Sequence, residues 1–178
     1  MQKVKVKDKE FEVFITEKEI LKAIDVVVEK MQKDLQGKNP LFIAILNGAF
    51  MFASDLFKKY EGDCEISFVK YASYAGTSTT GQVITLIGSN EKVTDRTVVI
   101  LEDIIDSGIT MEKVVSDIKE FNPLDVKIAT LLFKPEAFTK NYPIDYIGLS
   151  IPNDFIVGYG LDYDGYGRNL KDIYKICN

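Results

Sequence analysis

The sequence predicts an α/β fold with an open, mainly parallel twisted sheet flanked by helices. Apolar runs that suit buried strands alternate along the chain with segments of helical periodicity. The runs at 41–46 (LFIAIL) and 97–101 (TVVIL) are continuously apolar or nearly so, as strands buried on both faces of a parallel sheet are. Ligands of such sheets bind beyond the carboxyl ends of the strands, so the residues that follow the strands are the functional candidates.

The first helix of this fold is expected to begin after Thr16. Glu19 stands three residues later and completes a capping box, in which each side chain bonds the other residue's backbone. Apolar residues recur at helical spacing from Ile20 to Leu35, and Gly37 follows as a stop signal. A helix is therefore expected between Thr16 and Gly37.

The remaining elements alternate between β-rich runs and helical segments. The residues at 73–81 (SYAGTSTTG) are small and polar, which predicts a mobile loop at the tip of a long hairpin. We expect strands at 41–46, 66–71, 82–87, 97–101, 126–133 and 146–149, and helices through 50–57 and 111–120.

Composition excludes several classes of function. The 178 residues suit a single domain that spans 1–178. A net charge of −5 disfavours nucleic acid as a partner, because most of the surface would repel phosphates. The chain has no histidine, which excludes Ser-His-Asp and Cys-His catalysis and the histidine-containing zinc sites. Acid–base chemistry must therefore come from carboxylates, Lys, Tyr or Cys.

Three further features indicate a cytoplasmic protein without a membrane partner. Cys64 and Cys177 are far apart in the sequence and lack metal-ligand spacing, which fits a reducing compartment. The first 13 residues are charged and lack the apolar stretch of a signal peptide. Nowhere does the chain approach the roughly 20 apolar residues of a membrane span.

The segment at 98–110 (VVILEDIIDSGIT) combines a buried strand, two adjacent acids, a short loop and a helix start. Backbone N–H groups between a strand end and a helix N-terminus form an anion site, which the helix dipole strengthens. Gly108 allows a ligand to approach the backbone, and the hydroxyls of Ser107 and Thr110 can donate hydrogen bonds. These features predict a site for a phosphate group.

The carboxylates of this segment extend the prediction to a phosphorylated sugar. Glu102 and Asp103 are acceptors suited to ribose hydroxyls and to magnesium-bound water. Asp106 lies inside the anion loop, where a carboxylate needs a reason such as proton transfer. The alternative is that Asp106, Ser107 and Thr110 only cap the helix. The strand–acid–loop–helix context as a whole favours the ligand site.

The same segment resembles the phosphoribosyl pyrophosphate signature of the type I phosphoribosyltransferases. Four other segments resemble the hypoxanthine-guanine branch of that family, and the resemblance covers the chain from about Phe14 to Tyr174. It implies the fold of that family, with a small hood formed by the N- and C-terminal segments. The four segments are 46–49 (LNGA) at the pyrophosphate loop, 73–74 at the mobile catalytic loop, 132–135 (LFKP) around a base-recognising lysine, and 155–163 (FIVGYGLDY) with Arg168 beyond it.

The resemblance implies a magnesium-dependent (Mg²⁺) transfer from phosphoribosyl pyrophosphate to a 6-oxopurine by a homodimer or homotetramer. Asp106 would be the catalytic base at the purine N7, and Glu102 and Asp103 would hold the ribose hydroxyls and the metal shell. The 5′-phosphate and ribose would be bound by Glu102, Asp103, Asp106, Ser107, Gly108, Ile109 through its backbone, and Thr110.

The resemblance also implies residues for the purine and the pyrophosphate. Lys134 would donate to the oxygen at C6, Phe155 would stack on the base, and Ile156 would pack at its edge. Taken alone, Lys134 suggests a solvated surface residue and Phe155 a core residue. Asp162 would lie near the purine and take a second magnesium. Pyrophosphate would be bound by Leu46, Asn47, Gly48 and Arg168, under a mobile loop that begins at Ser73 and Tyr74.

One departure and three alternatives remain open in the sequence. The family commonly has lysine where this chain has Asn47, which puts pyrophosphate binding and subunit contacts at that loop in doubt. In the family, the peptide bond of this loop is often strained and sometimes cis.

Lys134 with Phe155 argues against adenine as the base, whereas a xanthine-preferring enzyme is harder to exclude. A regulator that keeps the fold and binds RNA or DNA is disfavoured by the charge of −5 and by Asp106.

Overall fold

The computed structural model describes residues 2–70, 85–87 and 93–177. Within these residues the body of the protein is a six-stranded sheet in the order β5-β4-β3-β6-β7-β8. Adjacent strands along the series β4-β3-β6-β7-β8 pair in parallel, and only the edge strand β5 runs antiparallel to its neighbour β4. The strands are β3 (Leu41–Leu46), β4 (Glu65–Lys70), β5 (Thr85–Ile87), β6 (Thr97–Ile105), β7 (Asp125–Phe133) and β8 (Tyr146–Ser150).

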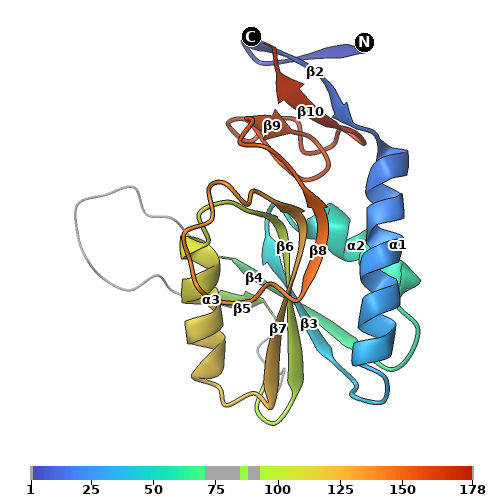
Figure 1. Cartoon of the computed structure of the whole chain (residues 1–178), viewed down its shortest axis with the longest axis vertical. Helices are drawn as coiled ribbons and strands as arrows, with labels where there is room; N and C mark the ends of the chain where they lie inside the picture. The colour runs from blue at the N-terminus through green and yellow to red at the C-terminus, as the bar shows by residue number, and fades with distance from the viewer. Residues whose placement is uncertain (1, 71–84, 88–92, 178) are drawn as a thin grey trace, which may run out of the picture.

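Helices cover both faces of this sheet (Figure 1). The helices α1 (Glu17–Asp34) and α2 (Phe50–Lys59) pack on one face, and α3 (Ile109–Lys119) packs on the other. The apolar run of β3 serves both layers, because successive side chains point to opposite faces. Phe42 and Ala44 belong to the core under α1 and α2, whereas Ile43 and Ile45 belong to the core under α3. The predicted open, mainly parallel sheet is therefore confirmed.

The start of α1 follows the predicted capping box. Thr16 is the N-cap, its hydroxyl accepts from the Glu19 backbone, and the Glu19 carboxylate accepts from the Thr16 backbone. A second carboxylate reaches the same helix end from the far end of the chain, because Asp172 Oδ1 accepts from the Glu17 nitrogen at 2.7 Å. The C-terminal segment is thereby tied to the first helix.

The expected hood is a second, four-stranded antiparallel sheet among the described residues, in the order β1-β2-β10-β9. Its strands come from both ends of the chain, and both termini lie at the end of the hood that points away from the main sheet (Figure 1). A separate apolar cluster that includes Phe11, Val157 and Tyr174 forms its core. The strands are β1 (Lys3–Val6), β2 (Lys9–Ile15), β9 (Ile156–Val157) and β10 (Ile173–Ile176).

The structure corrects the predicted end of the central strand. β6 continues four residues beyond 101, because its pairing with β7 extends to Ile105 opposite Phe133. Glu102 and Asp103, which were expected directly after the apolar strand, are therefore inside it. The helix expected at 111–120 begins two residues earlier, at Ile109, directly after the loop.

Other expected elements agree with the structure to within a residue or two where it describes them. β5 pairs antiparallel with β4, as the predicted hairpin requires. The expected loop at 73–81, with Ser73 and Tyr74, lies outside the described residues. None of the helices in the described ranges is both long and apolar enough to cross a membrane.

Candidate active site

The candidate site lies at the carboxyl ends of β3, β6 and β7. β6 brings Glu102 and Asp103 to this edge as adjacent carboxylates. Glu102 is 9% exposed; burial raises its pKa well above the ordinary value, and repulsion from Asp103 adds to the effect. Burial also raises the pKa of Asp103, although the nearby Arg168 guanidinium partly offsets the rise. Burial thus disfavours the charged forms of these two adjacent carboxylates, and a bound cation would stabilise those forms.

The donor set at this place fits magnesium. The described part of the chain contains no cluster of three or more metal-ligating side chains. Magnesium, however, is usually held by one or two carboxylates together with water and substrate phosphates. Glu102 and Asp103 match that pattern, and Asp103 Oδ1 is held in place by the Ile104 nitrogen at 2.8 Å.

The anion loop at 106–110 has the geometry that a phosphate needs. Gly108 is the N-cap of α3 in the left-handed region, at φ 82°, and makes no side-chain capping hydrogen bond. Only a long contact of 3.5 Å joins the Ile109 nitrogen to Ser107 Oγ. Ser107 thus caps the helix only weakly, and N–H groups of the first helical turn remain available to an anion.

A neighbouring segment holds this loop by its carbonyls. The Tyr142 hydroxyl donates to the Gly108 oxygen at 2.8 Å, and Thr139 donates to the Ser107 oxygen from both its nitrogen and its hydroxyl at 3.3 Å. A β-carbon at Gly108 would lie 2.5 Å from the Phe138 ring. The loop encloses a cavity of about 100 Å³, lined by residues that include Glu102, Asp106, Ser107, Gly108 and Thr110. No motif in the sequence marks the supporting residues Phe138, Thr139 and Tyr142.

Lys134 lies beside Asp106, the catalytic candidate of the same loop. Its side chain is buried, at 8% exposure of the residue, so the surface interpretation is wrong. Its nitrogen donates to the Ile105 oxygen at 3.0 Å, which fixes the start of the side chain. Its ammonium lies 3.2 Å from Asp106 Oδ2 and donates to Asn153 Oδ1 at 3.2 Å. Asn153 was missed in the sequence because a lone Asn after a proline marks only a turn.

The aromatic candidate is presented to solvent. Phe155 is 47% exposed, so the core interpretation is wrong. Tyr163 supports it in an edge contact with ring centroids 5.9 Å apart. The Ile156 side chain, by contrast, is buried in the core at 7% exposure. Any contact of Ile156 with a ligand would therefore come from its backbone.

The segment expected to bind pyrophosphate packs closely against Asp103 on one side and against Gly160 on the other. The Leu46–Asn47 peptide is cis. A β-carbon on Gly48 would lie 1.6 Å from Asp103 Oδ2, and one on Gly160 would lie 2.1 Å from the Gly48 oxygen. The segments 46–48, 102–103 and 158–160 thus pack against one another with no room for side chains between them. Asn47 itself is exposed.

Arg168 and Asp162 are joined to this cluster. Arg168 Nη1 donates to the Gly160 oxygen at 2.7 Å, and Nη2 lies 2.7 Å from Asp162 Oδ1. Asp162 Oδ2 accepts from the Gly165 nitrogen at 2.6 Å. Both carboxylate oxygens of Asp162 thus have protein partners, so a metal there would have to share them.

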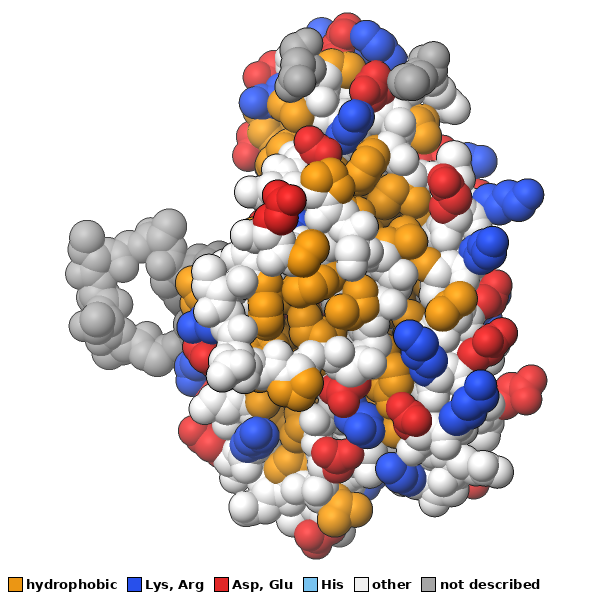
Figure 2. Space-filling model, viewed as in Figure 1, with side chains coloured by type: hydrophobic (Ala, Val, Ile, Leu, Met, Phe, Trp, Pro, Cys, Tyr) orange, Lys and Arg blue, Asp and Glu red, His pale blue; other side chains and the backbone are white. Residues whose placement is uncertain are grey.

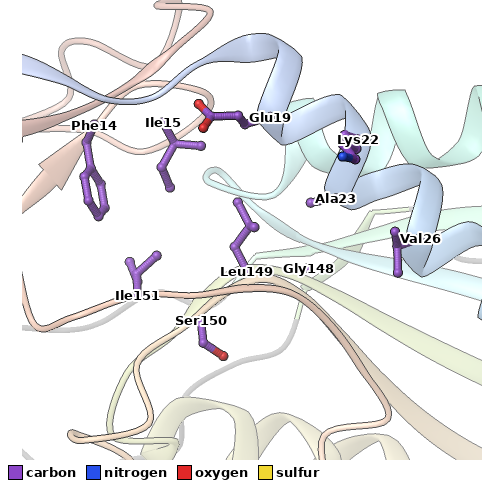
Figure 3. A pocket seen from close by; sticks show the side chains of 10 residues that line it. All are labelled: Phe14, Ile15, Glu19, Lys22, Ala23, Val26, Gly148, Leu149, Ser150 and Ile151. Carbon is purple, nitrogen blue, oxygen red and sulfur yellow. The ribbon is translucent and has the colours of Figure 1, made fainter.

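A larger pocket lies elsewhere and contains none of the candidate residues. Apolar side chains gather in the middle of the face on which β8 lies (Figure 2). A pocket of about 430 Å³ lies between α1 and β8. Its lining is mainly apolar, with Phe14, Leu149 and Ile151 toward the hood and Glu19 and Lys22 along the helix (Figure 3).

An open α/β sheet with a loop suited to an anion after its central strand is typical of the class of proteins that bind phosphorylated ligands. A family model described as a phosphoribosyl transferase domain matches residues 15–164. The chain therefore belongs to the phosphoribosyltransferase family, as the five motifs indicated.

The similar proteins fall in one branch of that family. The hypoxanthine-guanine phosphoribosyltransferase of Lactococcus lactis is 39% identical over 159 residues, which cover 89% of this chain and 86% of that protein. The hypoxanthine phosphoribosyltransferase of Buchnera aphidicola is 40% identical over 167 residues, or 92% and 94% of the two chains. A crystal structure of a Bacillus anthracis hypoxanthine-guanine phosphoribosyltransferase is 33% identical, covers 94% of this chain and 97% of its own, and has a TM-score of 0.83.

Proposed function

We propose that this chain transfers the phosphoribosyl group of phosphoribosyl pyrophosphate to hypoxanthine and guanine, and so forms IMP and GMP in purine salvage. One observation carries the choice of base. The Lys134 ammonium and the Asp106 carboxylate lie 3.2 Å apart beside the phosphate loop. They present a donor and an acceptor side by side, next to the place where the sugar phosphate would sit.

A 6-oxopurine matches this pair along one edge. Its oxygen at C6 accepts a hydrogen bond, and the neighbouring N7 carries the proton that must leave when N9 attacks the sugar. Lys134 can only donate, so it suits the oxygen, while Asp106 accepts from N7. Adenine presents an amino donor at the same place, where the ammonium would meet an unfavourable partner. The exposed ring of Phe155 supplies a stacking surface for the base.

The reaction forms the bond from N9 to the anomeric carbon and breaks the bond from that carbon to pyrophosphate. The proton at N7 passes to Asp106. The anion loop, with Ser107, Gly108, Ile109 and Thr110, holds the 5′-phosphate and fixes the anomeric carbon relative to the base.

Glu102 and Asp103 would hold the metal and the ribose hydroxyls. Magnesium bound there supplies charge neutralisation for the departing pyrophosphate. Leu46, Asn47, Gly48 and Arg168 lie around the same carboxylates, on the side where pyrophosphate would leave. Asp162 is proposed to take a second magnesium, in exchange for part of its pairing with Arg168.

We place this activity in the cytoplasm, in a single domain that assembles as a homodimer or homotetramer on small-molecule substrates. The free thiols of Cys64 and Cys177 support a reducing compartment. Light scattering on the purified chain would give the assembly state, and a monomer at micromolar concentration would contradict this part of the proposal.

Asp106→Asn tests the proposed mechanism. The substitution keeps the side-chain shape but removes the proton acceptor, so kcat with hypoxanthine should fall by about 10²- to 10⁴-fold, the usual contribution of a general base. The KM for phosphoribosyl pyrophosphate should change little, because the loop backbone is intact. An unchanged kcat would contradict the role of Asp106. Faster turnover of xanthine than of hypoxanthine by the wild-type chain would favour the xanthine alternative.

A further inference from the structure

We infer that Asn153 is a positioning residue for purine recognition, which acts by aiming the Lys134 ammonium. The inference rests on the proposed function, because it assigns a role toward the base that Lys134 would bind. Its basis is the hydrogen bond from Lys134 Nζ to Asn153 Oδ1 at 3.2 Å, at a lysine that is only 8% exposed.

The ammonium has three donors on a flexible stem, so its direction must be set by its partners. Within the described residues, Asp106 accepts one of these hydrogen bonds and Asn153 accepts a second. The third remains for an acceptor on a ligand. With two directions fixed from the two sides, the third is fixed as well, which is what discrimination at a purine C6 requires.

The chemistry of the partner supports this role. An ammonium cannot accept, so Asn153 must present its oxygen and not its NH₂ group. The oxygen of a neutral amide is enough to satisfy the donor, and a carboxylate oxygen could accept in its place. Asn153 thereby holds Lys134 while leaving the ion pair with Asp106 as the stronger contact.

The position of Asn153 in the chain adds a second consequence. It lies between β8 of the main sheet and β9 of the hood, two residues before Phe155. Its hydrogen bond joins Lys134, at the end of β7, to the segment that carries the exposed ring. One contact thus links the donor to the purine oxygen, just after β7, to the segment after β8 that carries the stacking surface.

The test compares Asn153→Leu, which removes the acceptor at similar volume, with Asn153→Asp, which keeps an acceptor oxygen. Asn153→Leu should raise the KM for hypoxanthine and the dissociation constant of IMP about tenfold, as loss of a hydrogen bond to a charged group does. Its kcat should change less than about threefold, since Asp106 is intact. Asn153→Asp should stay within about threefold of the wild type in both constants.

A control separates aiming from general damage. Asn141→Leu makes the same change on another exposed loop and should leave the KM for hypoxanthine unchanged. The KM for phosphoribosyl pyrophosphate should be unaffected in the Asn153 variants, and thermal unfolding would verify that each is folded. If Asn153→Leu misfolds, Asn153→Ala removes the acceptor as well and gives the same comparison.

Equal effects of the Leu and Asp substitutions, or a normal KM in Asn153→Leu, would overturn the inference while leaving the proposed function standing. Absence of turnover by the wild-type chain would overturn both.

Discussion

Gly48→Ala should disable the enzyme while leaving it folded, and the reason lies in a single contact. A β-carbon at this position would lie 1.6 Å from Asp103 Oδ2 and 2.4 Å from its Cγ. The backbone of Gly48 is not left-handed, so alanine brings no conformational strain of its own. The whole effect of the methyl group therefore falls on the carboxylate that we propose as a magnesium ligand.

The size of the displacement sets the expected magnitude. Non-bonded atoms are not found closer than 3.0 Å to a β-carbon, so Oδ2 must move by about 1.4 Å. That movement also strains the 2.8 Å hydrogen bond from the Ile104 nitrogen to Oδ1. A misplacement near 1 Å in an active site lowers the rate by about 10²-fold, or about 2.7 kcal/mol in the activation free energy. Overpacking should lower the free energy of unfolding by only about 1–3 kcal/mol.

The assay measures kcat/KM with hypoxanthine over a range of magnesium concentrations, together with the midpoint of thermal unfolding. Gly37→Ala is the matched control. A β-carbon there meets nothing within 4 Å, and only its left-handed backbone, at φ 74°, opposes alanine. Gly37→Ala should therefore lose some stability and keep its activity, whereas Gly48→Ala should lose activity at all accessible magnesium concentrations.

Wild-type kcat/KM in Gly48→Ala would refute the reasoning, since it would mean that the position of Asp103 does not matter to catalysis. Equal losses of activity in both variants would refute it in another way, by making the effect a general consequence of lower stability.

Three further expectations follow from other contacts. Lys134→Met should raise the KM for hypoxanthine by about 10- to 100-fold and narrow the preference over adenine, as steady-state kinetics would reveal; an unchanged preference would count against the lysine. Asp172→Ala removes the acceptor for the Glu17 nitrogen and should lower the free energy of unfolding by about 1–2 kcal/mol in urea titrations, which an unmoved midpoint would contradict. Burial raises the pKa of Glu102, so the ionised carboxylate destabilises the metal-free fold as the pH rises above about 4.5, and most fully above the raised pKa. Glu102→Gln should therefore have a larger free energy of unfolding than the wild type at pH 8 but not at pH 4. If the variant and the wild type were equally stable at both pH values, the raised pKa would be disproved.

The main sheet was predictable because its buried strands are continuous apolar runs in the sequence. β3 and β6 contribute side chains to cores on both faces, and a continuous run is the direct consequence. The hood strands were expected only as a region. β9 has two residues, and β1 is a mixture of lysines and valines, so neither carries a pattern long enough to define a strand. Their pairing joins the two ends of the chain, which no local signal records.

Some parts of the candidate site were predictable from the sequence, and others were not. The anion loop and the acids were predictable because 98–110 is one continuous motif in its expected context. The contacts that hold the site were not. Tyr142, Asn153 and Gly160 act through long-range backbone or side-chain contacts, with Gly108, Lys134 and Gly48 respectively. Each of these residues is ordinary in its own sequence neighbourhood and acquires its role only from the fold.

The most direct test of the proposed function is pyrophosphate release by the wild-type chain with phosphoribosyl pyrophosphate, magnesium and each of four bases in parallel. Release with hypoxanthine and guanine but not with adenine is the expected result, because Lys134 offers only donors where adenine also presents a donor. The rate with xanthine, compared with the rate with hypoxanthine, tests the alternative of a xanthine-preferring enzyme. Release with adenine at a comparable rate would contradict the assignment of Lys134. No release with any base, while phosphoribosyl pyrophosphate still binds, would contradict the enzyme assignment and favour a non-catalytic regulator with the same fold.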